Sequence, residues 1–340
     1  MVDLIHIGDY KTGTSWWQTK ILPIHQEIYY LDDPSKHPDV VHLMHLLIDS
    51  RDLDFDEVYL REKFSQILSK INLTNQKVVI CREALSGSFP TGDNAARIAY
   101  RLKAVFGSTK ILIVIREQFS MLKSIYSQYI KMGGTLSFND FVYDPIVSPG
   151  LIERLKYHKI IQKYIELFDN HNVMIGLFED FRLDNIGFAN KVFDFIGCNK
   201  INQECAELVK VNRSLTKIGL EIQRIINHFL RNHYNPRKSF FPLSKIITYL
   251  LPSKLKQRIL KSVQNRLIYS KEVSNQILLQ YAIDFAITVY ISKLCEYFQF
   301  GPKLTVPTDI KRRLSDEFAG SNRILLTKYG LPVDKFGWVL

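Results

Sequence analysis

The stretch that most constrains the fold is LIHIGDYKTGTSWWQ, which covers residues 4–18. It joins an apolar run to a turn with two glycines, Gly8 and Gly13, and then to Thr14 and Ser15. An apolar run predicts a buried strand, glycine permits a tight turn, and Thr or Ser favours a helix start. Because N–H groups at such a helix start attract anions, the stretch predicts a strand, a phosphate-binding turn and a helix.

The position of its lysine distinguishes this turn from the common nucleotide-binding P-loop. In G-x-x-x-x-G-K-[ST] the lysine follows the second glycine. Here Lys11 precedes Gly13 by two residues, and Thr14 stands where the lysine would be. No clear acidic residue of the Walker-B type follows the later strands either, since Ile115 leads into Arg116. A magnesium-dependent triphosphatase is therefore disfavoured.

Further apolar runs repeat the pattern of strand, polar turn and helix. Together with residues 4–7 the runs cover residues 78–80, 111–115 and 173–177. This repetition predicts an α/β fold, an open and mostly parallel sheet flanked by helices. Ligands of such sheets bind beyond the carboxyl ends of the strands. We therefore expect the functional residues in the segments 8–15, 81–88 and 116–124.

The chain of 340 residues is predicted to form one domain with an elaborated lobe. We expect an α/β core over residues 1–214, a basic helical insert over residues 215–304 that forms a cap, and a segment over residues 305–340 that returns to the core. Helical periodicity dominates the insert, which is interrupted by HYNPRKSFFP and LPS.

The net charge of +11 is concentrated in one stretch, because residues 206–275 hold 14 Lys and Arg against three Glu. Such a stretch is a solvated helical lobe, a site for an acidic polysaccharide or other anionic glycan, or a surface for peripheral membrane contact through residues 240–263. We favour the polysaccharide. No nucleic-acid-binding motif accompanies the charge, so we expect no nucleic acid partner.

Cysteine and histidine usage indicates a cytoplasmic protein without a metal. Cys81, Cys198, Cys205 and Cys295 form no C-x-x-C pair, which is typical of reduced thiols. The nearby histidines at 37, 42 and 45 lack a metal-binding context. The first residues read as a strand, and no run of 18 apolar residues occurs, so we expect neither a cleavable signal nor a membrane span.

A second anion-binding group follows the third of these strands. The sequence ILIVIREQFSMLKSIYSQY places Arg116 at the strand end and Ser124 eight residues later in the next helix. A guanidinium can bind a phosphate through two hydrogen bonds, and a hydroxyl two helical turns on could add a third.

The KTGTS loop combined with R-x₇-S resembles the sulfotransferases that use 3′-phosphoadenosine 5′-phosphosulfate. The resemblance implies this co-substrate, adenosine 3′,5′-bisphosphate as product, and no metal. It also implies that the first motif binds the 5′-phosphosulfate and that Arg116 and Ser124 bind the 3′-phosphate. The first motif comprises Lys11, Thr12, Gly13, Thr14, Ser15 and Trp16. The segment FAGSNRILLTKYGLPVDKFGW, with Asn322 and Trp338, resembles the carboxyl-terminal signature of carbohydrate and bacterial members.

The same resemblance implies a mechanism. Glu83, just past the second predicted strand in VVICREALSG, would be the general base that takes a proton from an acceptor hydroxyl or amine. Lys11 would stabilise the leaving group, and the acceptor would be a carbohydrate or glycolipid. The alternative for Glu83 is a structural carboxylate paired with Arg82 or Lys11. The alternative functions are a P-loop nucleotide kinase or triphosphatase and a non-enzymatic anion- or nucleic-acid-binding protein.

Overall fold

The computed structural model describes residues 2–201, 215–230, 275–298 and 301–340, and isolated residues at 234, 249, 252–254 and 256–257. It consists of two compact units. The first comprises Met1–Met121, Pro145–Val211 and Thr308–Leu340, and the second comprises Leu122–Asp144 and Asn212–Pro307. The segment Leu122–Asp144, which the sequence analysis placed in the core, thus belongs with the second unit. The division predicted at residues 214 and 305 stays a prediction.

The first unit contains a parallel sheet of five strands in the order β2-β3-β1-β4-β5. Its strands are β1 (Leu4–His6), β2 (Ile28–Tyr30), β3 (Lys77–Cys81), β4 (Lys110–Ile115) and β5 (Val173–Leu177). β1 is central, because Leu4 pairs with Val79 of β3 on one side and with Lys110 of β4 on the other. The predicted open parallel sheet is confirmed. The short edge strand β2 was not predicted.

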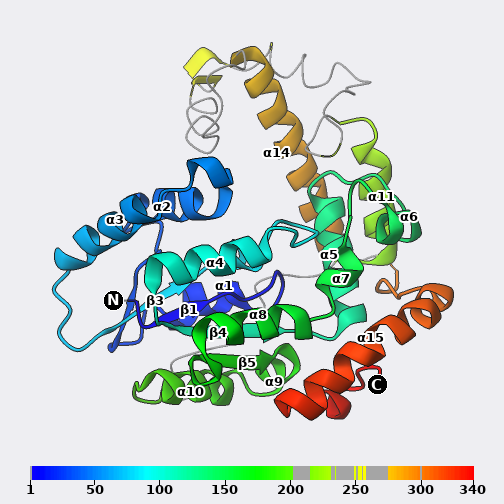
Figure 1. Ribbon diagram of the computed structural model, residues 1–340. Helices are drawn as coiled ribbons and strands as arrows, with labels where there is room; N and C mark the ends of the chain where they lie inside the picture. The colour runs from blue at the N-terminus through cyan, green and yellow to red at the C-terminus, as the bar shows by residue number, and fades with distance from the viewer. Residues whose placement is uncertain are drawn as a thin grey trace. The chain divides into compact units, whose positions relative to one another are not determined.

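Helices cover both faces of this sheet (Figure 1). One face packs against α4 (Ala95–Phe106) and α8 (His158–Phe168). The other packs against α1 (Thr14–Trp16), its π-helical continuation η1 (Trp17–Ile21), α9 (Phe178–Leu183) and α10 (Asn185–Ile196). Because strand side chains alternate between faces, Leu4, Val79 and Val114 enter the core beneath α10.

The remaining helices of the first unit are α2 (Pro38–Asp49), α3 (Glu57–Ser69), α7 (Leu151–Arg154) and α15 (Thr308–Tyr329), with single turns at Asp52–Asp54, Glu83–Ser86, Asn170–Asn172 and Val333–Phe336.

α15 fixes the start of α5 (Gln118–Lys131). Asn322 of α15 is fully buried, and its amide group accepts from Gln118 at 2.5 Å and donates to the Val339 carbonyl at 2.7 Å. Asn322 therefore has a structural role in this protein.

The second unit includes the rest of α5 and the helices α6 (Phe138–Tyr143), α11 (Lys217–Asn227) and α14 (Asn275–Phe298). The amide of Asn227 donates to the carbonyls of Ile130 and Gly134, each at 2.8 Å, and so joins α11 to the end of α5.

Within the described part of the chain, no helix is both long and apolar enough to cross a membrane. Residues 240–263, the predicted membrane-contact segment, lie almost wholly outside the described residues, as does most of the basic stretch.

Candidate functional site

The loop between β1 and α1 turns through two left-handed residues, Lys11 with a φ of 64° and Gly13 with a φ of 92°. A Cβ at Gly13 would lie 2.7 Å from the Phe181 ring, and one at Gly8 would lie 2.5 Å from Nε2 of His6. Close packing therefore requires both glycines, and the left-handed conformation is a second requirement at Gly13. A lysine in this conformation costs of order 1–3 kcal/mol, a strain that is common where loops bind ligands.

His6 supports this loop from below as a neutral side chain. Burial lowers the pKa of His6 to about 3, so the imidazole carries no charge at ordinary pH. Its Nδ1 lies 3.1 Å from Sγ of Cys81 on the neighbouring strand. The support beneath the loop is thus rigid and uncharged, and any positive charge at the loop must come from elsewhere.

Hydrogen bonds inside the loop determine which of its N–H groups are available to a ligand. The N–H of Thr12 donates to the Asp9 carbonyl at 3.3 Å, and the N–H of Trp16 donates to the Gly13 carbonyl at 2.9 Å. The described residues provide no acceptor for the N–H groups of Gly13, Thr14 and Ser15. The Thr14 hydroxyl is likewise buried without a partner among them. These four donors are therefore the groups of the loop that could bind an anion.

Trp16 differs from the other residues predicted to bind the co-substrate. Its indole is 5% exposed and packs edge-on against Trp17 and Phe181, with ring centroids 5.6 and 5.1 Å apart. The backbone N–H of Trp16 also donates to the Gly13 carbonyl, so Trp16 positions the loop by packing. Its predicted contact with a ligand stays a prediction.

Glu83 follows β3 directly and begins a short helical turn beside the loop. Burial raises the pKa of Glu83, the Lys11 ammonium lowers it, and the Asp9 carboxylate raises it again. Lys11 and Glu83 therefore act on each other electrostatically. Their predicted roles, leaving-group stabiliser and general base, stay predictions. Both side chains are half-buried.

Arg82 is not the partner of Glu83. Its Nε lies 3.3 Å from the buried carboxylate of Asp32, which also accepts the Cys81 N–H at 2.9 Å. Burial raises the pKa of Asp32 to about 6, against these two interactions. The pairing with Arg82, one structural alternative for Glu83, is therefore wrong.

Arg116 leaves β4 and is held beside the glycine loop. Its guanidinium donates to the Ser120 hydroxyl at 2.7 and 3.0 Å and to the Lys11 carbonyl at 3.1 Å, and it lies 4.7 Å from the centroid of the Phe178 ring. Burial lowers the pKa of Arg116, while nearby Glu179 raises it. Within the described residues no carboxylate forms an ion pair with it. The Arg116 guanidinium is thus held by a hydroxyl, a backbone carbonyl and an aromatic ring, none of which is charged.

The hydroxyl that holds Arg116 is that of Ser120, four residues later in α5. Ser124 was predicted to contact the 3′-phosphate. Ser124 lies one turn further, in the part of α5 that belongs to the second unit, and is half-buried. Its predicted role stays a prediction. The signal for Ser120 was in the sequence, because a serine four residues after a strand-end arginine is one helical turn away.

Two glutamates fix the turn that carries Arg116. The Glu117 carboxylate accepts the N–H groups of Phe119 at 2.9 Å and Ser120 at 2.7 Å, which caps the start of α5. The Glu179 carboxylate accepts the Glu117 N–H at 3.0 Å. The turn is therefore tied to α9 at the end of β5.

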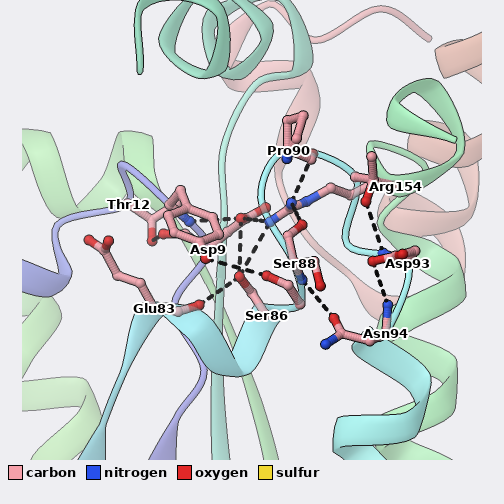
Figure 2. Close-up of polar contacts among 12 residues, drawn as sticks. Asp9, Thr12, Glu83, Ser86, Ser88, Pro90, Asp93, Asn94 and Arg154 are labelled. Carbon is pink, nitrogen blue, oxygen red and sulfur yellow. Dashed lines mark hydrogen bonds and ion pairs between the residues drawn. The ribbon is translucent and has the colours of Figure 1, made fainter. Parts of the chain in front are cut away.

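A buried ion pair joins the loop to the segment after β3 (Figure 2). The guanidinium of Arg154, from α7, bonds Asp9 of the loop, and these side chains are 6% and 11% exposed. Arg154 also donates to the Pro90 carbonyl at 2.9 Å and to the Ser86 hydroxyl at 3.3 Å. The pair neutralises a carboxylate that would otherwise repel a phosphate. Figure 2 shows the Glu83 side chain extending away from Arg154.

The donors assembled here fit a phosphorylated anion. Three N–H groups and the Arg116 guanidinium, which contacts the Lys11 carbonyl, lie at the carboxyl ends of β1 and β4, where a parallel sheet binds ligands. The described residues contain no group of three or more His, Cys, Asp or Glu side chains that could hold a metal ion.

Comparisons with known proteins give one family. Residues 2–217 match the family model described as "Sulfotransferase domain". No curated protein sequence matches the chain. Among solved structures, a sulfotransferase from Alicyclobacillus acidocaldarius is 18% identical with a TM-score of 0.44, over 62% of this chain and 87% of that one. The sulfotransferase domain of the Synechococcus PCC 7002 olefin synthase is 9% identical with a TM-score of 0.37, over 74% and 95%. A mouse sulfotransferase complexed with PAP is 10% identical with a TM-score of 0.30, over 82% and 87%.

Proposed function

Because the chain belongs to the sulfotransferase domain family and is a sulfotransferase, we propose that its donor is 3′-phosphoadenosine 5′-phosphosulfate and its acceptor a hydroxyl or amine. The donor, when bound, supplies a sulfuryl group whose bond to the bridging phosphate oxygen breaks during transfer. The product is then adenosine 3′,5′-bisphosphate. The acceptor class we propose is a carbohydrate or glycolipid.

One observation carries the choice of donor. The guanidinium of Arg116 donates to the backbone carbonyl of Lys11 at 3.1 Å, so the arginine and the glycine loop lie against each other. A nucleotide with phosphates at both its 3′ and 5′ positions presents two anionic groups to such a pair of sites. A donor with a single phosphate chain would leave one of them unused.

The residues of the loop take the end of the nucleotide that reacts. The N–H groups of Gly13, Thr14 and Ser15 donate to the oxygens of the 5′-phosphosulfate. The Lys11 ammonium neutralises the charge that develops on the bridging oxygen, and one such positioned group is worth about 3–4 kcal/mol of transition-state stabilisation. Arg116 binds the 3′-phosphate, with Ser124 as its proposed second contact.

Glu83 takes the proton of the acceptor. A base acts best when its pKa lies near the working pH. Burial raises the pKa of Glu83 towards that range, while the Lys11 ammonium opposes the rise. The proton moves from the acceptor oxygen or nitrogen to the Glu83 carboxylate as the acceptor attacks sulfur.

The acceptor class rests on the sequence. The segment over residues 318–338 resembles carbohydrate-type members, and the basic stretch over residues 206–275 would suit an acidic glycan. A cytoplasmic enzyme with peripheral membrane contact through the basic stretch would also reach a glycolipid. We propose no nucleic acid partner.

The test is transfer from ³⁵S-labelled donor to a panel of glycans, glycolipids and small phenols, without added metal. We expect label in at least one glycan or glycolipid, and none with the Lys11→Ala variant. Lys20→Ala, outside the loop at the end of η1, is the matched control and should retain activity. Hydrolysis of ATP that requires magnesium, with no labelled acceptor, would instead identify a nucleotide kinase or triphosphatase.

A further inference from the structure

A cavity of about 330 Å³ lies between the sheet and the helices α4 and α8, within the first unit. Its lining is mostly apolar and includes Ile7 of the chain after β1, Ile113 and Ile115 of β4, and Ile160 of α8. Cavities of this size hold small organic molecules, and an apolar lining with a few polar groups is typical of such sites. The cavity lies directly behind the glycine loop, because Asp9 also lines it.

Two of the residues that line this cavity are tyrosines with buried hydroxyls. Tyr157 immediately precedes α8 and Tyr164 lies within it, seven residues on, so both occupy one side of the helix, two turns apart. Both line the cavity and are only 2% and 1% exposed. Neither hydroxyl has a hydrogen-bond partner among the described residues. Buried hydroxyls are nearly always bonded, so these two call for a ligand oxygen.

Both phenols are neutral donors. Burial raises the pKa of Tyr164, and burial together with the Asp9 carboxylate raises the pKa of Tyr157, while Arg154 opposes the rise. Each hydroxyl therefore keeps its proton at ordinary pH and can donate it to an acceptor oxygen.

The cationic side chains around the cavity already have carboxylate partners, and Asp93 adds a further carboxylate to the lining. Arg154 is paired with Asp9, Lys156 with Glu153 and Glu317, Lys159 with Glu153, and Lys163 with Glu166. An anionic ligand would have to displace one of these carboxylates. The lining thus favours an uncharged molecule over an acid or a phosphate.

We propose that this cavity binds a small, uncharged, mostly apolar molecule whose carbonyl or ether oxygen accepts hydrogen bonds from Tyr157 and Tyr164. Of the donor loop only Asp9 lines this site, and the site does not depend on the identity of the sulfuryl donor or acceptor. Since Asp9 belongs to both the cavity wall and the loop, a molecule bound here touches the loop from behind.

The test uses benzophenone, an apolar ketone that carries no hydroxyl or amine and so cannot accept a sulfuryl group. Its failure to bind is therefore distinguishable from a failure of sulfuryl transfer. Binding to the full chain is measured by titration calorimetry. Irradiation then inserts the excited ketone into a nearby C–H bond, its oxygen taking the hydrogen, and mass spectrometry locates the label. We expect saturable binding and label on residues that line the cavity, which lie within residues 7–9, 85–86, 92–96, 113–115 and 153–164.

Two variants and a control decide the outcome. Tyr164→Phe removes one donor and should weaken benzophenone binding about tenfold, the effect of one lost hydrogen bond to a buried group. Ala95→Phe fills the cavity and should abolish both binding and label. Tyr59→Phe, an exposed tyrosine of α3, should change neither. Tyr164→Phe removes only an oxygen atom, so it keeps the test valid if Ala95→Phe does not fold.

The proposal is overturned if benzophenone does not bind, if the label lies on none of the residues that line the cavity, or if Tyr164→Phe binds as tightly as the unaltered protein. The last result, combined with a higher unfolding temperature of Tyr164→Phe, would mean that the hydroxyl is buried without any partner.

Discussion

The turns after β1 and after β4 follow neighbouring strands, yet they present different chemical groups to a ligand. The β1 turn offers backbone N–H groups, and its shape depends on Gly8 and Gly13 at positions that admit no side chain. The β4 turn offers one charged side chain, Arg116, and its shape depends on the carboxylates of Glu117 and Glu179. One site therefore depends on backbone conformation, and the other on charge and side-chain hydrogen bonds.

This difference indicates what each turn can recognise. Convergent N–H groups surround a small anion closely and tolerate changes in its charge during a reaction. A planar guanidinium binds a fixed phosphate through two parallel bonds. The β1 turn thus suits the reacting end of a nucleotide and the β4 turn its unreactive end. The following substitutions test that division of roles.

The largest effect is expected from Glu83→Gln, which should leave both anion-binding turns intact. Loss of a general base lowers turnover by about 10²–10⁴-fold. Burial raises the pKa of Glu83, so the unaltered enzyme should lose activity as the pH falls through that raised pKa, where the carboxylate becomes protonated. The residual activity of Glu83→Gln should lack this limb. Measuring kcat/KM as a function of pH for the unaltered enzyme and for Glu83→Gln tests this prediction. A variant that keeps the acidic limb would assign the base elsewhere.

Lys11→Ala should come next, because it removes charge from the β1 turn without removing its N–H groups. We expect a fall in kcat of about 10²–10³-fold, typical of a lost transition-state contact. Affinity for adenosine 3′,5′-bisphosphate should fall much less, since this product lacks the sulfuryl group. Steady-state kinetics measure the fall in kcat, and titration with adenosine 3′,5′-bisphosphate measures the change in affinity for the product. An equal loss in both quantities would show that Lys11 serves binding alone.

Gly13→Ala should have the smallest effect on chemistry and a clear effect on the fold of the loop. A Cβ at φ 92° that also meets Phe181 at 2.7 Å should cost about 2–3 kcal/mol of unfolding free energy. Gly150→Ala is the matched control, because Gly150 has a φ of 72° but no heavy atom within 4 Å of its added Cβ. It should cost about 1–2 kcal/mol, the price of the left-handed conformation alone. Urea unfolding measures both. Equal costs would mean that Phe181 yields to the new methyl group.

The sequence was sufficient for the features that arise within short segments. The strand, glycine turn and helix over residues 4–18 were predictable because the buried strand and the tight turn each need particular residues in order. Glu83 and Arg116 were predictable as site residues because each directly follows an apolar run. The three-residue strand β2 was missed because Ile28–Tyr30 is too short for a periodic pattern.

What the sequence could not predict depends on contacts between distant segments. Asp9 and Arg154 are 145 residues apart in the sequence, and no sequence motif contains both of them. Their pairing is a product of the fold, which brings α7 to the loop. Similarly, no pattern in the sequence indicates that Trp16 packs against Phe181, or that the hydroxyls of Tyr157 and Tyr164 line one cavity.

The central claim is that the glycine loop and Arg116 bind opposite ends of one nucleotide. Calorimetric titration of adenosine 3′,5′-bisphosphate and adenosine 5′-monophosphate into the unaltered protein and Arg116→Ala tests it, with the nearby exposed Arg182→Ala as control. The account predicts that the 3′-phosphate improves affinity about 10–100-fold in the unaltered protein and in Arg182→Ala, and about threefold or less in Arg116→Ala. An undiminished benefit from the 3′-phosphate in Arg116→Ala would contradict it.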